Sequence, residues 1–125
     1  MDKGQWYQHF WEQFGWPAYD ESTIPEKGEN TAVLPYITYM EVEDEFNHPV
    51  YPNASLWDYG TSWERISKKA DEIANAIGLG GQVHRLNNGL VWVQRGHPFA
   101  QRVSDDNDMI RRIILNIELE FLTVS

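Results

Sequence analysis

The stretch from Ile110 to Val124 constrains the fold more than any other part of the sequence, because its apolar and polar side chains alternate. The apolar set is Ile113, Leu115, Ile117, Leu119 and Phe121, with Asn116, Glu118 and Glu120 between its members. A period of two predicts a β-strand that buries one face. Each such side chain contributes roughly 1.5–3 kcal/mol when buried, against a net stability of about 5–15 kcal/mol for a small domain. We therefore expect the sheet to be built around this strand.

The opening segment has the spacing of a helix instead. Its aromatic side chains fall on one helical stripe, namely Trp6, Tyr7, Phe10, Trp11 and Phe14. With Asp2 and Gln5 as a capping pair, and Gly15 and Pro17 as a stop signal, the segment predicts a helix over residues 4–14. We expect the stripe to pack on the sheet, and a contact between subunits is the alternative.

A longer helix is predicted between Thr61 and Gly78. One face of this segment is apolar and comprises Trp63, Ile66, Ala70, Ile73 and Ile77. Thr61 and Glu64 have the spacing of a capping box, and Gly78 suits the left-handed residue that commonly ends a helix.

Four further strands are expected. One lies within residues 31–43, beginning near Pro35, and a second, from Ala54 to Tyr59, pairs back on it. Asn88-Gly89 separates two strand-like runs within residues 82–96, which is the pattern of a β-hairpin.

The connecting segments complete the fold class. Residues 17–31, 43–53 and 97–109 carry prolines, glycines or charges without periodicity and are interpreted as loops. The resulting order, α-β-β-α-β-β-β, predicts a single α+β domain over residues 1–125. Two helices should pack on one face of a mainly antiparallel sheet.

Composition excludes several classes of function. The chain has no cysteine, which excludes thiol catalysis, Cys-based zinc sites and a disulfide scaffold, and fits a reducing compartment. Nineteen acidic against ten basic residues give a formal charge of −9, so the chain should repel nucleic-acid phosphates. The opening residues lack the pattern of a signal peptide and no apolar run is long enough for a membrane span, so we expect the protein in the cytosol of the cell that makes it.

Residues that could carry chemistry are scattered. His9, His48, His84 and His97 lie in four separate segments without the paired spacing of a zinc site, and are interpreted as surface or hydrogen-bonded histidines. No nucleophile elbow or phosphate-binding loop is present. The sequence therefore predicts no catalytic residue, no metal ligand and no cofactor, and we do not expect an enzyme.

Two acidic groups have alternative interpretations. Glu118 and Glu120 point to the same face of the last strand, roughly 7 Å apart, which would suit a glycosidase, but any solvated strand produces the same geometry. The run from Asp105 to Asp108 could hold calcium through oxygen ligands, but it lacks the spacing of an EF-hand loop. A polar turn is the preferred interpretation of that run.

The order of segments resembles a known family along nearly the whole chain. The segments are F-G-W-P-A-Y, L-P-Y-I-T-Y, S-L-W-D-Y-G-T-S-W-E-R-I-S-K-K-A-D-E-I-A-N-A-I-G, G-L-V-W-V-Q-R-G-H-P-F-A-Q-R and R-R-I-I-L-N-I-E-L-E-F-L. In this order they resemble the tail terminator (tail completion) proteins of long-tailed phages and related prophages of Gram-positive bacteria.

The resemblance implies a virion structural protein. Such proteins form a ring, generally a hexamer, at the head-proximal end of the tail tube, stop tail polymerisation and provide the surface on which the head docks. The implied partners are further copies of the chain, the tail tube protein and the head connector or head-completion protein, with DNA passing through the lumen without specific binding. The implied location is the tail or neck of the virion, after assembly in the host cytoplasm. A head-completion or connector-adaptor neck protein is the alternative, and a monomeric binding module or a small enzyme stays open.

A ring needs two different patches on each subunit, and large aromatic side chains are common anchors of such interfaces. The candidate anchors are Trp57, Tyr59 and Trp92. In the loop over residues 43–53 we expect Phe46, Val50 and Tyr51 to contact a neighbouring subunit or the tail tube, and an idle surface loop is the alternative.

Overall fold

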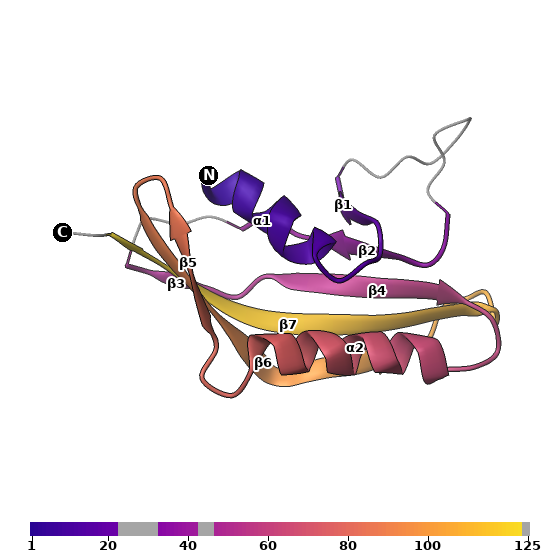
Figure 1. The fold of residues 1–125 in the computed structure, drawn as a ribbon. Helices are drawn as coiled ribbons and strands as arrows, with labels where there is room; N and C mark the ends of the chain where they lie inside the picture. The colour runs from indigo at the N-terminus through magenta and orange to yellow at the C-terminus, as the bar shows by residue number, and fades with distance from the viewer. Residues whose placement is uncertain (23–32, 43–46, 124–125) are drawn as a thin grey trace.

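The computed structural model describes residues 1–22, 33–42 and 47–123, and it shows a sheet of seven strands with two helices on one face (Figure 1). The elements in chain order are α1 (Lys3–Glu12), β1 (Ala18–Asp20), β2 (Tyr36–Tyr39), β3 (Pro49–Val50), β4 (Asn53–Tyr59), α2 (Glu64–Ile77), β5 (Gln82–Leu86), β6 (Gly89–Val103) and β7 (Ile110–Thr123). The strands lie in the order β1-β2-β4-β7-β6-β5, and β3 pairs with β7. Of the described strand pairs, β1 with β2 is parallel and the others are antiparallel. The predicted α+β class is confirmed, and the structure adds the short strands β1 and β3.

Strand β7 is the centre of the sheet, as its alternation predicted. It pairs with β4 on one side and β6 on the other. Near its C-terminal end, Leu119 and Glu120 also pair with β3. The apolar set on this strand is buried: Ile113, Leu115, Ile117, Leu119 and Phe121 are each at most 3% exposed. These side chains form the floor on which both helices pack.

Helix α1 closes one end of that floor. Its first turn has the predicted capping box, because Gln5 N–H donates to Asp2 Oδ1 at 2.8 Å and Asp2 N–H donates to Gln5 Oε1 at 2.9 Å. The aromatic stripe is buried inside the chain, with Trp6 stacked on Phe10 at 5.0 Å and edge-on to Phe121 at 6.4 Å. The stripe therefore packs on the sheet, and the alternative of a subunit contact does not hold for it.

Helix α2 covers the other end of the floor through Ile66, Ala70, Ile73 and Ile77. Its predicted Thr61–Glu64 capping box is wrong, because the hydroxyl of Ser62 accepts from Glu64 N–H at 3.0 Å instead. The helix ends at Gly78, whose φ of +77° favours glycine. Among the described residues, neither helix is long and apolar enough to cross a membrane.

The predicted loop over residues 97–109 is wrong for its first half, because β6 continues to Val103. Pro98 cannot donate to a ladder, and the strand accommodates it with a bulge between Arg95 and Ala100. At this bulge Gly96 lies so close to Asn116 that a Cβ would fall 2.8 Å from the Asn116 carbonyl oxygen. The preceding hairpin is confirmed, but its turn is Asn87-Asn88 and Gly89 already pairs with Leu86.

Two other predicted loops also contain strands. β1 lies in the predicted loop over residues 17–31, where it is held by parallel pairing to β2. β3 lies in the predicted loop over residues 43–53, where Val50 pairs with Leu119 and is 6% exposed. Both strands are short and are set by tertiary pairing rather than by a local pattern.

Candidate functional site

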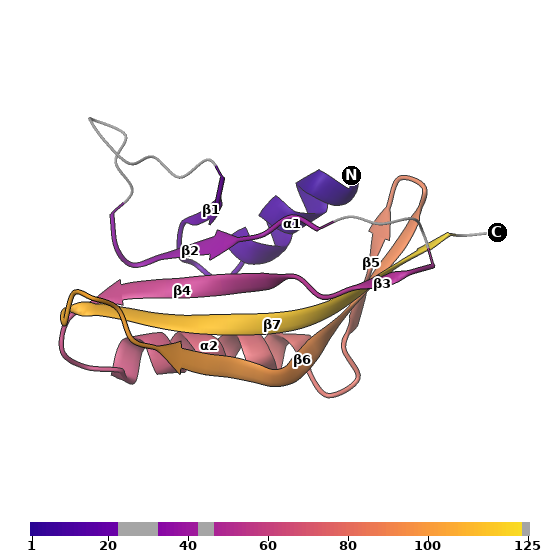
Figure 2. The same ribbon diagram turned by 180° about the vertical axis from the view of Figure 1, so that it is seen from behind.

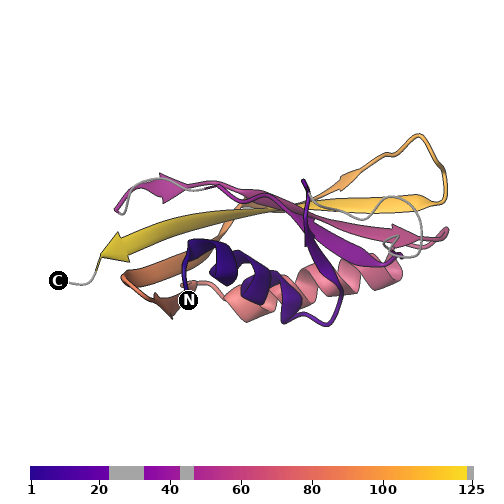
Figure 3. The same cartoon turned by 90° about the horizontal axis from the view of Figure 1, so that it is seen from above.

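The two faces of the sheet differ in what covers them. Seen from above, both helices lie on the same side of the sheet (Figure 3). The opposite view shows β4, β7 and β6 in front of α2, with no described helix over them (Figure 2). We call this side the uncovered face, and its side chains are those out of phase with the buried set of β7.

Aromatic side chains and an arginine gather at one end of the uncovered face, on strands β1, β2, β4 and β7. Pairing places Trp57 beside Tyr36 on one side and Arg112 on the other. The Tyr36 and Trp57 rings lie 6.5 Å apart, and Tyr19 meets Tyr36 edge-on at 5.8 Å. The guanidinium carbon of Arg112 lies 4.5 Å from the centroid of the Trp57 ring. These residues, Tyr19, Tyr36, Trp57 and Arg112, form what we call the aromatic end.

Hydrogen bonds fix the aromatic end in place. The indole N–H of Trp57 donates to Thr38 Oγ1 at 3.0 Å, and Arg112 Nε–H donates to Ser55 Oγ at 3.1 Å. Both hydroxyl residues are 4% exposed, although they lie on the uncovered face, because the two larger side chains cover them. The cluster is therefore preorganised, and a partner would find its side chains already ordered.

The far end of the same face is acidic and also carries a tryptophan. Trp92 pairs with Val83 on one side and Glu120 on the other, and its indole N–H donates to the Gly80 carbonyl at 3.1 Å. Val83 is 58% exposed. Glu118 lies two residues before Glu120 on β7, so both side chains are on the same face. We call Glu118, Glu120, Trp92 and Val83 the acidic end. The two glutamates lie on an open strand surface, which favours the solvated interpretation over a glycosidase cleft.

The structure separates the predicted interface residues into three groups. Trp57 and Trp92 are half-buried at opposite ends of the uncovered face, while Tyr59 and Tyr51 are 57% and 68% exposed. Val50 is part of the core, so its prediction as an interface residue is corrected. Phe46 lies outside the described residues.

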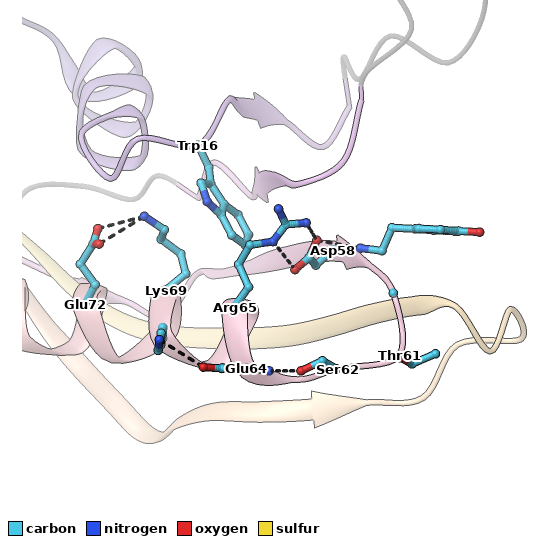
Figure 4. Close-up of a pocket in the computed structure, with 11 residues that line it drawn as sticks. Trp16, Asp58, Thr61, Ser62, Glu64, Arg65, Lys69 and Glu72 are labelled. Atoms are coloured by element: carbon cyan, nitrogen blue, oxygen red, sulfur yellow. Dashed lines mark hydrogen bonds and ion pairs between the residues drawn. The ribbon is translucent and has the colours of Figure 1, made fainter.

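A charged hollow lies on the other side of the molecule, between α2 and the segment that follows α1 (Figure 4). Its volume is about 630 Å³. Asp58 lies at its base, where both carboxylate oxygens accept from Arg65, through Nε at 2.9 Å and through Nη2. Burial by itself raises the pKa of Asp58, but hydrogen bonds from Arg65 and from the Tyr59 backbone, with the Arg65 charge, bring that pKa below its ordinary value.

The cations of this hollow have partners within the chain. Lys69 Nζ donates to the Phe14 carbonyl at 2.6 Å, pairs with Glu72 at 3.2 Å and lies 5.6 Å from the Trp16 ring. Lys68 pairs with Glu64 at 3.3 Å. The ion pairs and hydrogen bonds around the hollow therefore join α2 to β4 and to the end of α1, and we interpret them as structural contacts.

The residues considered for chemistry do not converge. Among the described residues there is no group of three histidine, aspartate or glutamate side chains placed to hold a metal ion. His84 instead accepts a hydrogen bond from Trp6 Nε1–H on Nδ1 at 2.8 Å, and burial lowers its pKa. The acidic run before β7 is a polar turn, because Asn107 N–H donates to Asp105 Oδ1 at 3.0 Å and Met109 N–H to Asn107 Oδ1 at 2.9 Å.

No protein-family model matches the chain, and no curated protein or solved structure is detectably similar to it.

Sequence reasoning identified Trp57 and Trp92 but missed the residues that make a surface of them. Arg112 and Tyr36 become neighbours of Trp57 only through strand register, and Tyr19 belongs to a strand that carries no local signal. One signal was present: Arg112 is in phase with Asn116, Glu118 and Glu120, which placed it on the uncovered face.

Proposed function

We propose that this chain is a structural protein of a long-tailed phage or prophage, a tail terminator. In this role it forms a ring at the head-proximal end of the tail tube, ends tail polymerisation and provides the surface on which the head docks. The proposal rests first on the order of sequence segments, which resembles that of tail terminators along nearly the whole chain.

The uncovered face is the structural observation that supports the proposal best. A contiguous patch of tryptophan, tyrosine and arginine has the composition of interface hot spots. Its side chains are held by Thr38 and Ser55 in the isolated chain, so little conformational entropy is lost on contact. A ring requires two different patches on each subunit, and the aromatic and acidic ends are two such patches.

The partners of this ring would be the tail tube protein on one side and the head connector on the other. DNA would pass through the lumen, and a chain with a formal charge of −9 offers few cations to hold phosphates. The protein would assemble in the host cytoplasm and remain in the tail or neck of the virion.

Assembly on tail tubes is the experiment that tests this proposal. The purified protein should be sized by light scattering and imaged in negative stain, alone and after mixing with tubes polymerised from the tail tube protein. We expect a ring at one end of each tube and no further growth at that end. A protein that stays monomeric at every concentration and leaves tubes growing would contradict the proposal, and binding to the connector alone would favour a head-completion protein.

A further inference from the structure

We infer that neighbouring copies of this chain join through their uncovered faces, with the aromatic end of one copy seated on the acidic end of the next. This inference rests on the proposed ring and specifies its subunit contact. It commits to a second copy of the chain as the occupant of the face.

The charge of Arg112 is presented without a carboxylate partner. Among the described residues no carboxylate lies within ion-pair distance of Arg112, and its side chain donates to the neutral hydroxyl of Ser55. The guanidinium carbon lies 4.5 Å from the centroid of the Trp57 ring, so the charge is held beside that ring. Arg112 shares this lack of an acidic partner with other arginines in the part of the chain that the structure describes, but it is the one that lies beside Trp57 at the aromatic end, where a carboxylate from a second copy can pair with it.

The acidic end offers the matching groups. Glu118 and Glu120 are half-buried on the same face of β7, and neither forms an ion pair or a side-chain hydrogen bond among the described residues. Trp92 and the 58% exposed Val83 supply apolar surface beside them. The charges of this end are therefore opposite to those of the aromatic end, and its apolar side chains can exclude water from a charge pair.

The two ends cannot satisfy each other within one copy. Arg112 and Glu118 lie on the same strand, six residues or roughly 20 Å apart along β7, and Glu120 lies roughly 26 Å away. A second copy can bring its glutamates to Arg112 of the first while its own Arg112 stays free for a third. When only one end of each face overlaps, such a head-to-tail contact is heterologous, and it produces a ring when the rotation between copies closes; full overlap of two faces would instead pair both ends at once in a two-fold dimer.

Charge reversal tests the contact. One variant is Arg112→Glu, and the other carries Glu118→Lys with Glu120→Lys; Lys68→Glu, on the outer surface of α2, changes the charge elsewhere as a control. Each variant should associate at least about tenfold more weakly than the unchanged protein, because like charges meet at every contact. The control should associate normally. A thermal melt of each variant separates lost association from lost folding.

Mixing the two charge-reversed proteins gives the most decisive test of the contact. Each contact then joins opposite charges again, so the equimolar mixture should recover ring formation, alone or on tail tubes, while each protein by itself does not. Folded variants that form rings as readily as the unchanged protein would overturn the inference, and so would a mixture that fails to recover. If the Arg112→Glu protein assembles normal rings that no longer cap tubes, the uncovered face contacts the tail tube rather than a second copy. That result would also overturn the inference. If the unchanged protein forms no ring even on tubes, the proposed function itself fails.

Discussion

Arg112 is stacked on Trp57, with its guanidinium carbon 4.5 Å from the ring centroid, and each side chain also donates a hydrogen bond to a hydroxyl beneath it. The two residues come from neighbouring strands of the sheet, β7 and β4, and they lie on the face that neither helix covers. An ordered arginine–tryptophan pair on a sheet face that neither described helix covers is therefore built into the folded chain.

Truncating Trp57 to Ala should weaken assembly. The change removes the ring on which Arg112 rests, at a typical hot-spot cost of about 2 kcal/mol or more in association. Trp92→Ala should weaken assembly in the same way from the other end of the face. Light scattering measures association and thermal melting measures folding. A variant that melts earlier but still associates normally would show that its tryptophan serves the fold alone.

Substitution on the two faces of β7 should have opposite outcomes. Ile117 is 1% exposed, so Ile117→Asp buries an unpaired charge and should unfold the domain. Even truncation at such a site costs about 2–5 kcal/mol. Glu118→Gln, one residue away on the uncovered face, should leave the melting temperature nearly unchanged. Equally mild effects of the two changes would mean that the faces of β7 are assigned wrongly.

Asp58 should make the protein sensitive to acid. Its pKa in the folded protein lies below the ordinary value of 3.8, so the unfolded chain binds the proton more readily. The stabilisation is therefore present above pH 3.8 and is lost as the pH falls through the lower, folded value. Asp58→Asn should cost about 1–3 kcal/mol at neutral pH and flatten the acid limb of urea-unfolding curves. The exposed Asp71→Asn is the matched control, and an equally flat limb for it would contradict the assignment to Asp58.

His84 should add a second pH dependence nearer neutrality. Trp6 donates to Nδ1, so the proton of the neutral ring is on Nε2, which donates to Gln82 Oε1 at 3.0 Å. Burial lowers the pKa of His84 below 6.5, so the unfolded chain takes up the proton first and stability should fall as the pH drops below 6.5 toward the lower, folded value. His84→Gln should remove this dependence, and the exposed His97→Gln should retain it. Urea unfolding at several pH values would reveal a mistaken assignment as a slope that survives in His84→Gln.

Two neighbouring residues at β3 should have different roles: Val50 is structural, and Tyr51 is a candidate contact residue. Val50 is buried, so Val50→Ala should lower the unfolding free energy by roughly 1.5 kcal/mol. Its neighbour Tyr51 is 68% exposed, so Tyr51→Ala should leave stability unchanged, and it should weaken tail capping if this segment meets a partner. Capping assays with both variants would refute the contact if Tyr51→Ala caps as well as the unchanged protein.

Long periodic segments were predictable from the sequence because the spacing of their buried side chains determines whether they form a strand or a helix. The alternation around Ile117 placed β7 at the centre of the sheet, and the helical stripe containing Trp6 placed α1 on its apolar floor. Short strands were not predictable. β1 and β3 have three and two residues, too few to show a period, and their pairing depends on β2 and β7.

The second half of β6 was missed for a different reason. Pro98 argues against a strand, and only the close approach of Gly96 to Asn116 shows how a bulge accommodates it. The candidate site was predictable only in part, because Trp57 is conspicuous in the sequence while its stacking on Arg112 depends on the register of β4 against β7. Register is a property of the folded sheet.

The central position of β7 also determines when the contacts of the core can form during translation. The strand that joins β4 to β6 leaves the ribosome after every other described element, and until it does, the aromatic stripe of α1 has no Phe121 to cover. At translation rates of about 5–20 residues per second, α1 waits on the order of ten seconds for that strand. Through this interval the aromatic stripe of α1 lacks its contact with Phe121, so a chaperone that binds aromatic segments would have a target in α1 until residues 110–123 arrive.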